Sequence, residues 1–201
     1  MMIVMRNTST NARTAAKDAT RERILSAAAR AIRRSGYDGT GVADLMKEAG
    51  LTHGAFYSHF PSREAMLAAA AAAACAESAT GAAELAASTP PDVALDVMLA
   101  AYLSKEHVAQ PEAGCPLAAL GSETSRQTPE VRRVLTRHVK ATVDLLARQS
   151  ADWGKHGAHD RALVMLSTMV GAVMLARAVD EPGLSDSLRE AALKHLTSIG
   201  H

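Results

Sequence analysis

Apolar residues recur along most of this 201-residue chain at the spacing of α-helices rather than in the alternation typical of β-strands. Residues 19–36 give the first example, with apolar positions in the i, i+3, i+4, i+7, i+8 pattern of a helix that buries one face. These positions are Ile24, Ala27, Ala28, Ala31 and Ile32. Thr20 is a candidate N-cap for this helix, and Gly36 is a candidate stop.

The same periodicity, interrupted by glycine and proline, predicts an all-α chain of about nine helices without a sheet. Thr52 and Ser62 precede two of the predicted helices as candidate caps, and residues 105–116 are expected to form a loop. The further helices are expected at 40–50, 53–59, 62–87, 91–104, 117–126, 128–153, 160–179 and 186–198.

Three regions follow from this organisation. We expect a flexible tail at 1–17, a small three-helix head at 18–64, and a larger helical body at 65–201. The net charge of the chain is only +1, but its distribution is uneven, since residues 1–66 carry +4 and the remainder carries −3. A basic head favours a polyanionic partner, although ordinary surfaces also differ by a few charges.

Composition excludes several classes of protein. The two cysteines, Cys75 and Cys115, are far apart and form no CxxC pair, which fits a reducing cytoplasm rather than a disulfide framework. The alanine-rich run at 66–76 is shorter than the roughly 20 residues of a membrane span, so we expect no membrane association. No nucleophile–base pair, phosphate loop or metal cluster is visible, so we expect neither an enzyme nor a cofactor.

The segment LTHGAFYSHF, Leu51 to Phe60, holds three of the six aromatic residues of the chain and predicts a helix-turn-helix. Gly50 allows the sharp turn after the second helix, and Leu51 then points into the head. The following helix is short, and its small residues would let its backbone enter a DNA major groove. The groups expected to face DNA from here are Thr52, His53, Gly54, Ala55, Tyr57, Ser58, His59 and Arg63.

Helical phase divides the aromatic residues of this segment. Phe56 and Phe60 are four residues apart and are expected in the core, whereas Tyr57 points the other way, towards DNA. A metal site at His53 and His59 is disfavoured, because their spacing is six and no carboxylate or cysteine accompanies them.

Residues 24–67, ILSAAARAIRRSGYDGTGVADLMKEAGLTHGAFYSHFPSREAML, resemble the DNA-binding head of the TetR/AcrR transcriptional regulators. The resemblance implies that the third helix reads bases and phosphates, and that Thr40, Gly41 and Val42 at the start of the second helix clamp the DNA backbone. Many members have Ser or Thr at Gly41 and Lys at His53. A neutral histidine releases fewer counterions, so we expect a shallow salt dependence of DNA binding, which a His53→Lys variant would steepen.

In the family that this head resembles, the C-terminal helices form a two-fold dimer and enclose a ligand pocket. Small residues four apart at 160–179 favour close helix packing with 186–198, either in a dimer or within one chain. The expected dimer residues are Ser167, Gly171, Ala172, Leu175, Leu188, Ala192 and Leu196. The expected pocket residues are Met98, Tyr102, Cys115, Leu117, Leu120, Val139, Met165 and Met169.

These features predict a homodimeric repressor that binds a palindromic operator in double-stranded DNA and is released by a small-molecule inducer. The body holds only two aromatic residues, Tyr102 and Trp153, which favours a compact aliphatic or polar ligand over a large planar one. Two alternatives remain open. The regulator could respond to a protein partner, or to modification of Cys115, whose thiol at a helix start would have a lowered pKa if exposed.

Overall fold

The computed structural model describes the backbone of residues 5–199 and the side chains of residues 12–198. Within this range the chain forms nine α-helices, two short 3₁₀ helices and no strand, which confirms the all-α prediction. In chain order these are α1 (Met5–Ser35), α2 (Val42–Glu48), η1 (His53–Ser58), α3 (Arg63–Ser88), α4 (Ala94–Tyr102), α5 (Lys105–Ala109), η2 (Pro111–Ala113), α6 (Pro116–Thr124), α7 (Pro129–Gln149), α8 (Ala158–Ala178) and α9 (Pro182–Ile199).

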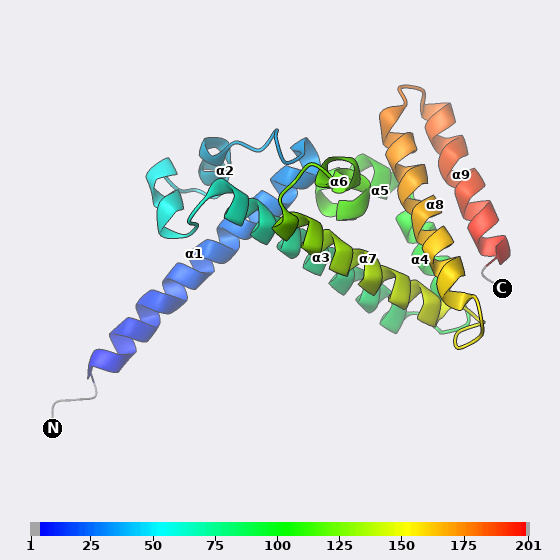
Figure 1. The fold of residues 1–201 in the computed structure, drawn as a ribbon, viewed down its shortest axis with the longest axis horizontal. Helices are drawn as coiled ribbons and strands as arrows, with labels where there is room; N and C mark the ends of the chain where they lie inside the picture. Colours follow the sequence, from blue (N-terminus) through cyan, green and yellow to red (C-terminus); the bar gives the residue numbers. More distant parts are fainter. Residues whose placement is uncertain (1–4, 200–201) are drawn as a thin grey trace.

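The head and the body lie at opposite ends of an elongated molecule (Figure 1). The second half of α1 forms the head with α2 and η1, and α3 runs from the head along α7 into the body. At the far end of the body, α8 and α9 form an antiparallel pair. The boundary that we expect between residues 64 and 65 falls in the first turn of α3, so one helix belongs to both regions.

The tail expected at 1–17 is helical from Met5 onward, and residues 1–4 lie outside the described part of the chain. No glycine or proline precedes Gly36, so nothing in the sequence stops α1 from extending towards the N-terminus. Thr20 is accordingly not an N-cap: it lies inside α1, and its hydroxyl donates to the Ala16 carbonyl at 2.8 Å. The N-terminal part of α1 projects away from the rest of the molecule (Figure 1).

Two further segments differ from their predicted form. The third helix of the head, η1, is a 3₁₀ helix, and the Thr52 side chain makes no capping bond to it. The loop expected at 105–116 contains α5 and η2, because Ser104 caps α5 by accepting the His107 N–H at 3.1 Å. Ser62 does cap α3, as predicted, by accepting the Ala65 N–H at 3.1 Å.

Two helices are long and apolar enough to cross a membrane, namely α3 and α8. The alanine-rich run at 66–76 is thus part of a 26-residue helix rather than an isolated short segment. Both helices pack within the body, α3 against α1 and α7, and α8 against α7 and α9. Each helix buries one side in these contacts, as helices of a bundle do, while part of α8 remains exposed.

Candidate DNA-binding face and ligand cavity

The inner side of η1 holds the head together. Phe56 and Phe60 are almost completely buried, and their rings stack with centroids 5.7 Å apart. Gly50 has a φ of 72°, a left-handed conformation that favours glycine, and it turns the chain from α2 towards η1. Leu51 then packs, partly buried, against the same core. The predicted core positions of the helix-turn-helix are therefore confirmed.

The outer side of η1 is open to solvent, and Tyr57 is 68% exposed. The Tyr57 ring meets His53 edge-on, with centroids 6.3 Å apart. A side chain at Gly54 would contact nothing within 4 Å, so the fold itself does not require glycine there. Of the predicted DNA-facing residues, those exposed are Gly41, Thr52, His53, Gly54, Tyr57 and Ser58, and those half-buried are Val42, Ala55, His59 and Arg63.

Thr40 and Arg63 have structural partners instead of a free outward position. Thr40 is only 4% exposed, and its hydroxyl donates to the Gly36 carbonyl at 2.8 Å. The Arg63 guanidinium donates to the carbonyls of Tyr37 at 2.5 Å and Thr40 at 3.3 Å. The prediction of direct DNA contact is wrong for the buried Thr40 side chain, because the α1–α2 turn uses its hydroxyl internally. Arg63 fixes the same turn from α3.

Arg33 connects the head to the body. Although it is an arginine, it is only 4% exposed, because it faces α3 and the loop before α6. Its guanidinium pairs with Glu77 of α3 at 2.5 Å and donates to the Gly114 carbonyl at 3.3 Å. Arg33 thus bonds the first helix of the head to two different segments of the body.

Tyr37 forms a second connection, at the turn after α1. Its backbone N–H donates to the Glu123 carboxylate at 2.9 Å, and its buried hydroxyl lies 3.5 Å from the Thr124 hydroxyl. Both partners lie in the last turn of α6. Burial raises the pKa of Tyr37 to about 12, so the phenol stays neutral. The position of α6 therefore fixes the turn that leads into α2.

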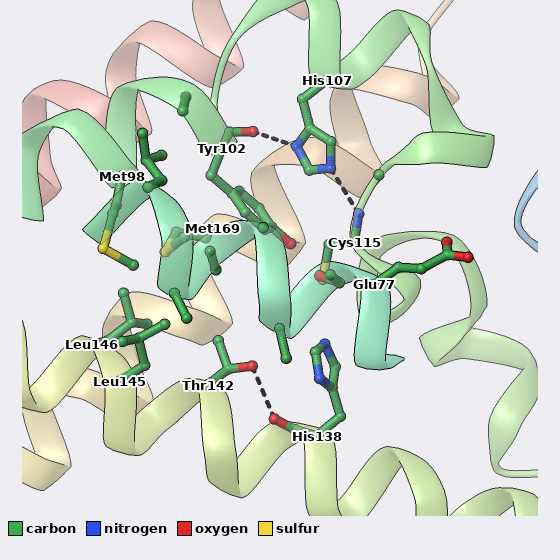
Figure 2. A pocket seen from close by; sticks show the side chains of 18 of the residues that line it. Glu77, Met98, Tyr102, His107, Cys115, His138, Thr142, Leu145, Leu146 and Met169 are labelled. Atoms are coloured by element: carbon green, nitrogen blue, oxygen red, sulfur yellow. Dashed lines mark hydrogen bonds between the residues drawn. The ribbon is translucent and has the colours of Figure 1, made fainter. Parts of the chain in front are cut away.

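The body contains a partly open cavity of about 550 Å³ between α3, α4, α7 and the loop before α6 (Figure 2). Four predicted pocket residues, Met98, Tyr102, Cys115 and Met169, line this cavity. The other four predicted residues do not: Leu117, Leu120 and Met165 are buried in the core, and Val139 is half-buried against it. Their helical phase turns them towards neighbouring helices instead of towards the cavity.

One cavity wall was absent from the prediction. It is formed by α3, where the run ESATGAAEL (77–85) contributes mainly small side chains and so leaves space beside α7. A side chain at Gly81 would meet nothing within 4 Å. Residues of α7 complete the lining, among them His138, Thr142, Leu145 and Leu146. Large apolar residues are missing from α3 between positions 77 and 84, and this gap in the sequence pattern could have indicated the wall.

His107 holds the loop that closes the cavity. The Cys115 N–H donates to His107 Nε2 at 3.0 Å, so the proton of the neutral ring is on Nδ1, which donates to the Tyr102 carbonyl at 2.5 Å. Gly114 is required here, since a Cβ would lie 2.6 Å from His107 Nε2. Burial lowers the pKa of His107, although its bond to Tyr102 acts in the opposite direction. The neutral ring is thus a structural element of the cavity wall.

The exposed sides of α8 and α9 form an apolar face. Leu175 is 54% exposed, Ser167 is exposed, and Gly171 and Leu188 are half-buried, as expected for residues available to a second copy of the chain. The prediction is wrong for three residues that are buried within the chain, namely Ala172, Ala192 and Leu196. The apolar face also includes residues that were not predicted, namely Leu163, Val164 and Leu184.

Known protein families match both the head and the body of the chain. Residues 24–70 match the family described as bacterial regulatory proteins, tetR family, and residues 91–192 match the C-terminal domain described as transcriptional regulator LmrA/YxaF-like. Both descriptions are of transcriptional regulators and not of enzymes.

Individual relatives agree with these matches. The HTH-type regulator LmrA of Bacillus subtilis is 27% identical over 160 residues, which cover 78% of this chain and 85% of LmrA. An uncharacterized HTH-type regulator of Mycobacterium tuberculosis is 29% identical over 172 residues, covering 78% of this chain and 84% of the relative. A TetR regulator from Chloroflexus aurantiacus superimposes with a TM-score of 0.75 and 27% identity, covering 90% and 94% of the two chains. The chain belongs to the TetR family of DNA-binding, helix-turn-helix transcriptional regulators.

Proposed function

We propose that this protein is a homodimeric cytoplasmic repressor that binds a palindromic operator and is released from it by a small molecule. One observation carries the proposal. Arg33 of the head is bonded to Glu77 and Gly114, and both of these residues line the cavity of the body. A molecule in the cavity therefore touches residues that also hold the first helix of the head.

The proposed DNA contacts lie on α2 and η1. Because a side chain at Gly54 would meet only open space, its backbone can approach a nucleic acid closely. Tyr57 is exposed and free to donate a hydrogen bond. The proposed contact residues are Gly41, Val42, Thr52, His53, Gly54, Ala55, Tyr57, Ser58 and His59, while Thr40 and Arg63 support them from behind.

A dimer through α8 and α9 would present two heads to one operator. Helix-turn-helix dimers bind half-sites one helical turn of DNA apart, about 34 Å, so the separation of the heads decides the fit. In the proposed switch, a ligand shifts the Gly114–Cys115 segment, which leads directly into α6. Because α6 holds Tyr37 through Glu123 and Thr124, its movement would reorient both heads and weaken the match to DNA.

The test of DNA binding is a gel shift with the DNA upstream of the protein's own gene. Gly54→Ala should weaken binding at least about tenfold, a loss of about 1.4 kcal/mol, because the new methyl group would stand between η1 and the groove. Gly121→Ala is the matched control, since a Cβ at Gly121 in α6 also meets nothing within 4 Å. Equal affinities of the two variants would contradict the proposed recognition helix.

The test of the dimer is sedimentation of Leu175→Glu, which places a charge at the centre of the apolar face. We expect this variant to be monomeric and to bind DNA weakly, since each head alone contacts only one half-site. Val93→Glu is the control, because Val93 is also an exposed apolar residue, at 41%, but precedes α4. A Leu175→Glu variant that remains dimeric would place the interface elsewhere.

A second candidate trigger is modification of Cys115, which is favoured by the position of this residue in the cavity lining. Cys115 is only 6% exposed, so a reagent would have to enter the cavity to reach its thiol. Cys115→Ser decides between the two triggers: DNA release that survives the substitution supports a reversible ligand. A protein partner, the other alternative, would act on the outer surface, and filling the cavity would then leave DNA release unchanged.

A further inference from the structure

The cavity has an apolar end and a polar end (Figure 2). Met98, Met169, Leu145 and Leu146 gather at the apolar end and offer flexible aliphatic surface. The Tyr102 hydroxyl lies at the other end, on the side of Cys115 and His138 (Figure 2). This division matches a molecule that is itself apolar over most of its length and polar at one end.

Two polar atoms at the polar end lack a well-formed hydrogen bond within the described part of the chain. These are the Tyr102 hydroxyl oxygen, which has only the weakly bonding Cys115 thiol beside it, and His138 Nε2, and both are shielded from bulk solvent. His138 as a whole is 5% exposed. A buried polar atom without a hydrogen bond costs about 1–3 kcal/mol, so a fold that keeps two of them beside one cavity is suited to a ligand that satisfies both.

The charged group of the cavity lining offers an ionic ligand no free partner. Glu77 is the charged residue of the lining, and it is already paired with Arg33. Burial lowers the pKa of His138 and of His107, which keeps both rings neutral near neutral pH. Arg177 lies outside the lining and donates to the carbonyls of His107 and Val108. A charged ligand would therefore lose its hydration without gaining an opposite charge in the lining.

We propose that the cavity binds a neutral, mainly aliphatic molecule with a hydroxyl or carbonyl group at one end, and that this group hydrogen-bonds to Tyr102 and His138. The inference rests on the proposed role of the cavity as the ligand site. A hydroxyl or carbonyl satisfies either partner, because the phenol can donate or accept and a neutral imidazole nitrogen can do either according to its tautomer. The opposite, methionine- and leucine-lined end would hold the hydrocarbon chain.

The experiment is isothermal titration of the full-length protein near neutral pH with four probes that share similar carbon chains. The probes are n-octanol, methyl hexyl ketone, octanoate and octylammonium. We expect the alcohol and the ketone to bind at least about tenfold more tightly than the two ions. Tyr102→Phe removes one oxygen from the polar end and should weaken octanol binding about two- to tenfold, the value of one neutral hydrogen bond. Tyr57→Phe removes the same atom from the head, far from the cavity, and should leave the octanol affinity unchanged.

Gly81→Leu tests whether the cavity is the ligand site, separately from whether its ligand is neutral. The added side chain would occupy the cavity, because a Cβ at this position meets open space, so it should abolish binding of all four probes. Probes that bind regardless of charge, or an octanol affinity unaffected by Tyr102→Phe, would overturn the neutral polar ligand while leaving the cavity as the ligand site. Failure of all four probes to bind, or binding that survives Gly81→Leu, would overturn the cavity itself and with it the ligand-release proposal.

Discussion

The outer face of the head and the cavity of the body are both candidate binding surfaces, but they keep their polar groups in opposite environments. Tyr57 on η1 is 68% exposed, so water satisfies its hydroxyl when no DNA is present. In the cavity, by contrast, His138 Nε2 is buried without a partner among the described residues, and the buried Tyr102 hydroxyl has only the weakly bonding Cys115 thiol beside it. The DNA-binding groups on the head should therefore have little effect on the stability of the free protein. The polar groups of the cavity should lower that stability.

The largest effect that tests this comparison is expected in the head, between two neighbouring residues. Phe56→Ala should destabilise the protein by about 3–5 kcal/mol, because it empties a fully buried site. Tyr57→Ala should change the free energy of unfolding by less than about 0.5 kcal/mol and yet weaken DNA binding strongly. Urea unfolding and a gel shift measure the two quantities. A large loss of stability in Tyr57→Ala would show that its exposed ring holds the fold and would remove the contrast.

Arg33→Met tests the connection between the two regions. We expect a loss of about 1–3 kcal/mol in unfolding free energy, because the Gly114 carbonyl loses a buried donor, while the Glu77 carboxylate is 46% exposed and can be hydrated. DNA binding should remain, but its release by an inducer should be reduced. Arg34→Met is the control, since Arg34 pairs with Glu48 at an exposed site worth less than about 1 kcal/mol. An undiminished response in Arg33→Met would mean that the signal travels through α6 alone.

The same comparison explains how far the sequence could predict each region. The core of η1 depends on residues four apart, such as Phe56 and Phe60, so helical phase alone separates buried from exposed positions. The cavity depends on helices far apart in the chain, and Leu120 and Met165 have the right chemistry but face other neighbours. Gly171 and Ala172 are neighbours in α8, but Gly171 is half-buried and Ala172 is buried in the core. An error of one residue in the assumed helical phase therefore places a residue on the wrong side of the helix.

Some features could not be inferred from a short pattern at all. Arg33 and its neighbour Arg34 are the same residue type in the same helix. Arg33 becomes a buried connection only because α3 and Gly114 pack beside its side of α1. The Thr40 hydroxyl is likewise withdrawn from the surface by a local bond to Gly36 that helical periodicity does not describe. Both depend on where distant or irregular backbone lies, which is fixed by packing rather than by residue spacing.

A smaller effect, of opposite sign, is expected in the cavity. His138→Leu removes an unsatisfied buried nitrogen from the polar end of the cavity and should stabilise the free protein by about 1 kcal/mol, while it weakens ligand binding. Thermal unfolding with and without n-octanol measures both changes. His156→Leu, in an exposed turn, should change the free energies of unfolding and of ligand binding by less than about 0.5 kcal/mol each. A destabilised His138→Leu would show that the ring already has its hydrogen bonds in the free protein and would end the contrast with the head.

The smallest effect is the pH dependence of the cavity wall. The pKa of His107 in the folded protein is lowered by burial below its unfolded value of about 6.5, so the unfolded chain binds more protons in the interval between the two values. Stability should therefore be constant above this interval and fall as the pH decreases below about 6.5, with His138 contributing in the same direction.

His107→Gln can still donate to the Tyr102 carbonyl but cannot be protonated, so its unfolding free energy should change less between about pH 7.5 and 5.5. The carboxylates with lowered pKa values, such as Asp186, lose their charge only at lower pH and do not obscure this range. Identical pH profiles for His107→Gln and the unmodified protein would mean that protonation of His107 costs the folded protein no stability, and the proposed pH sensitivity of the cavity wall would be wrong.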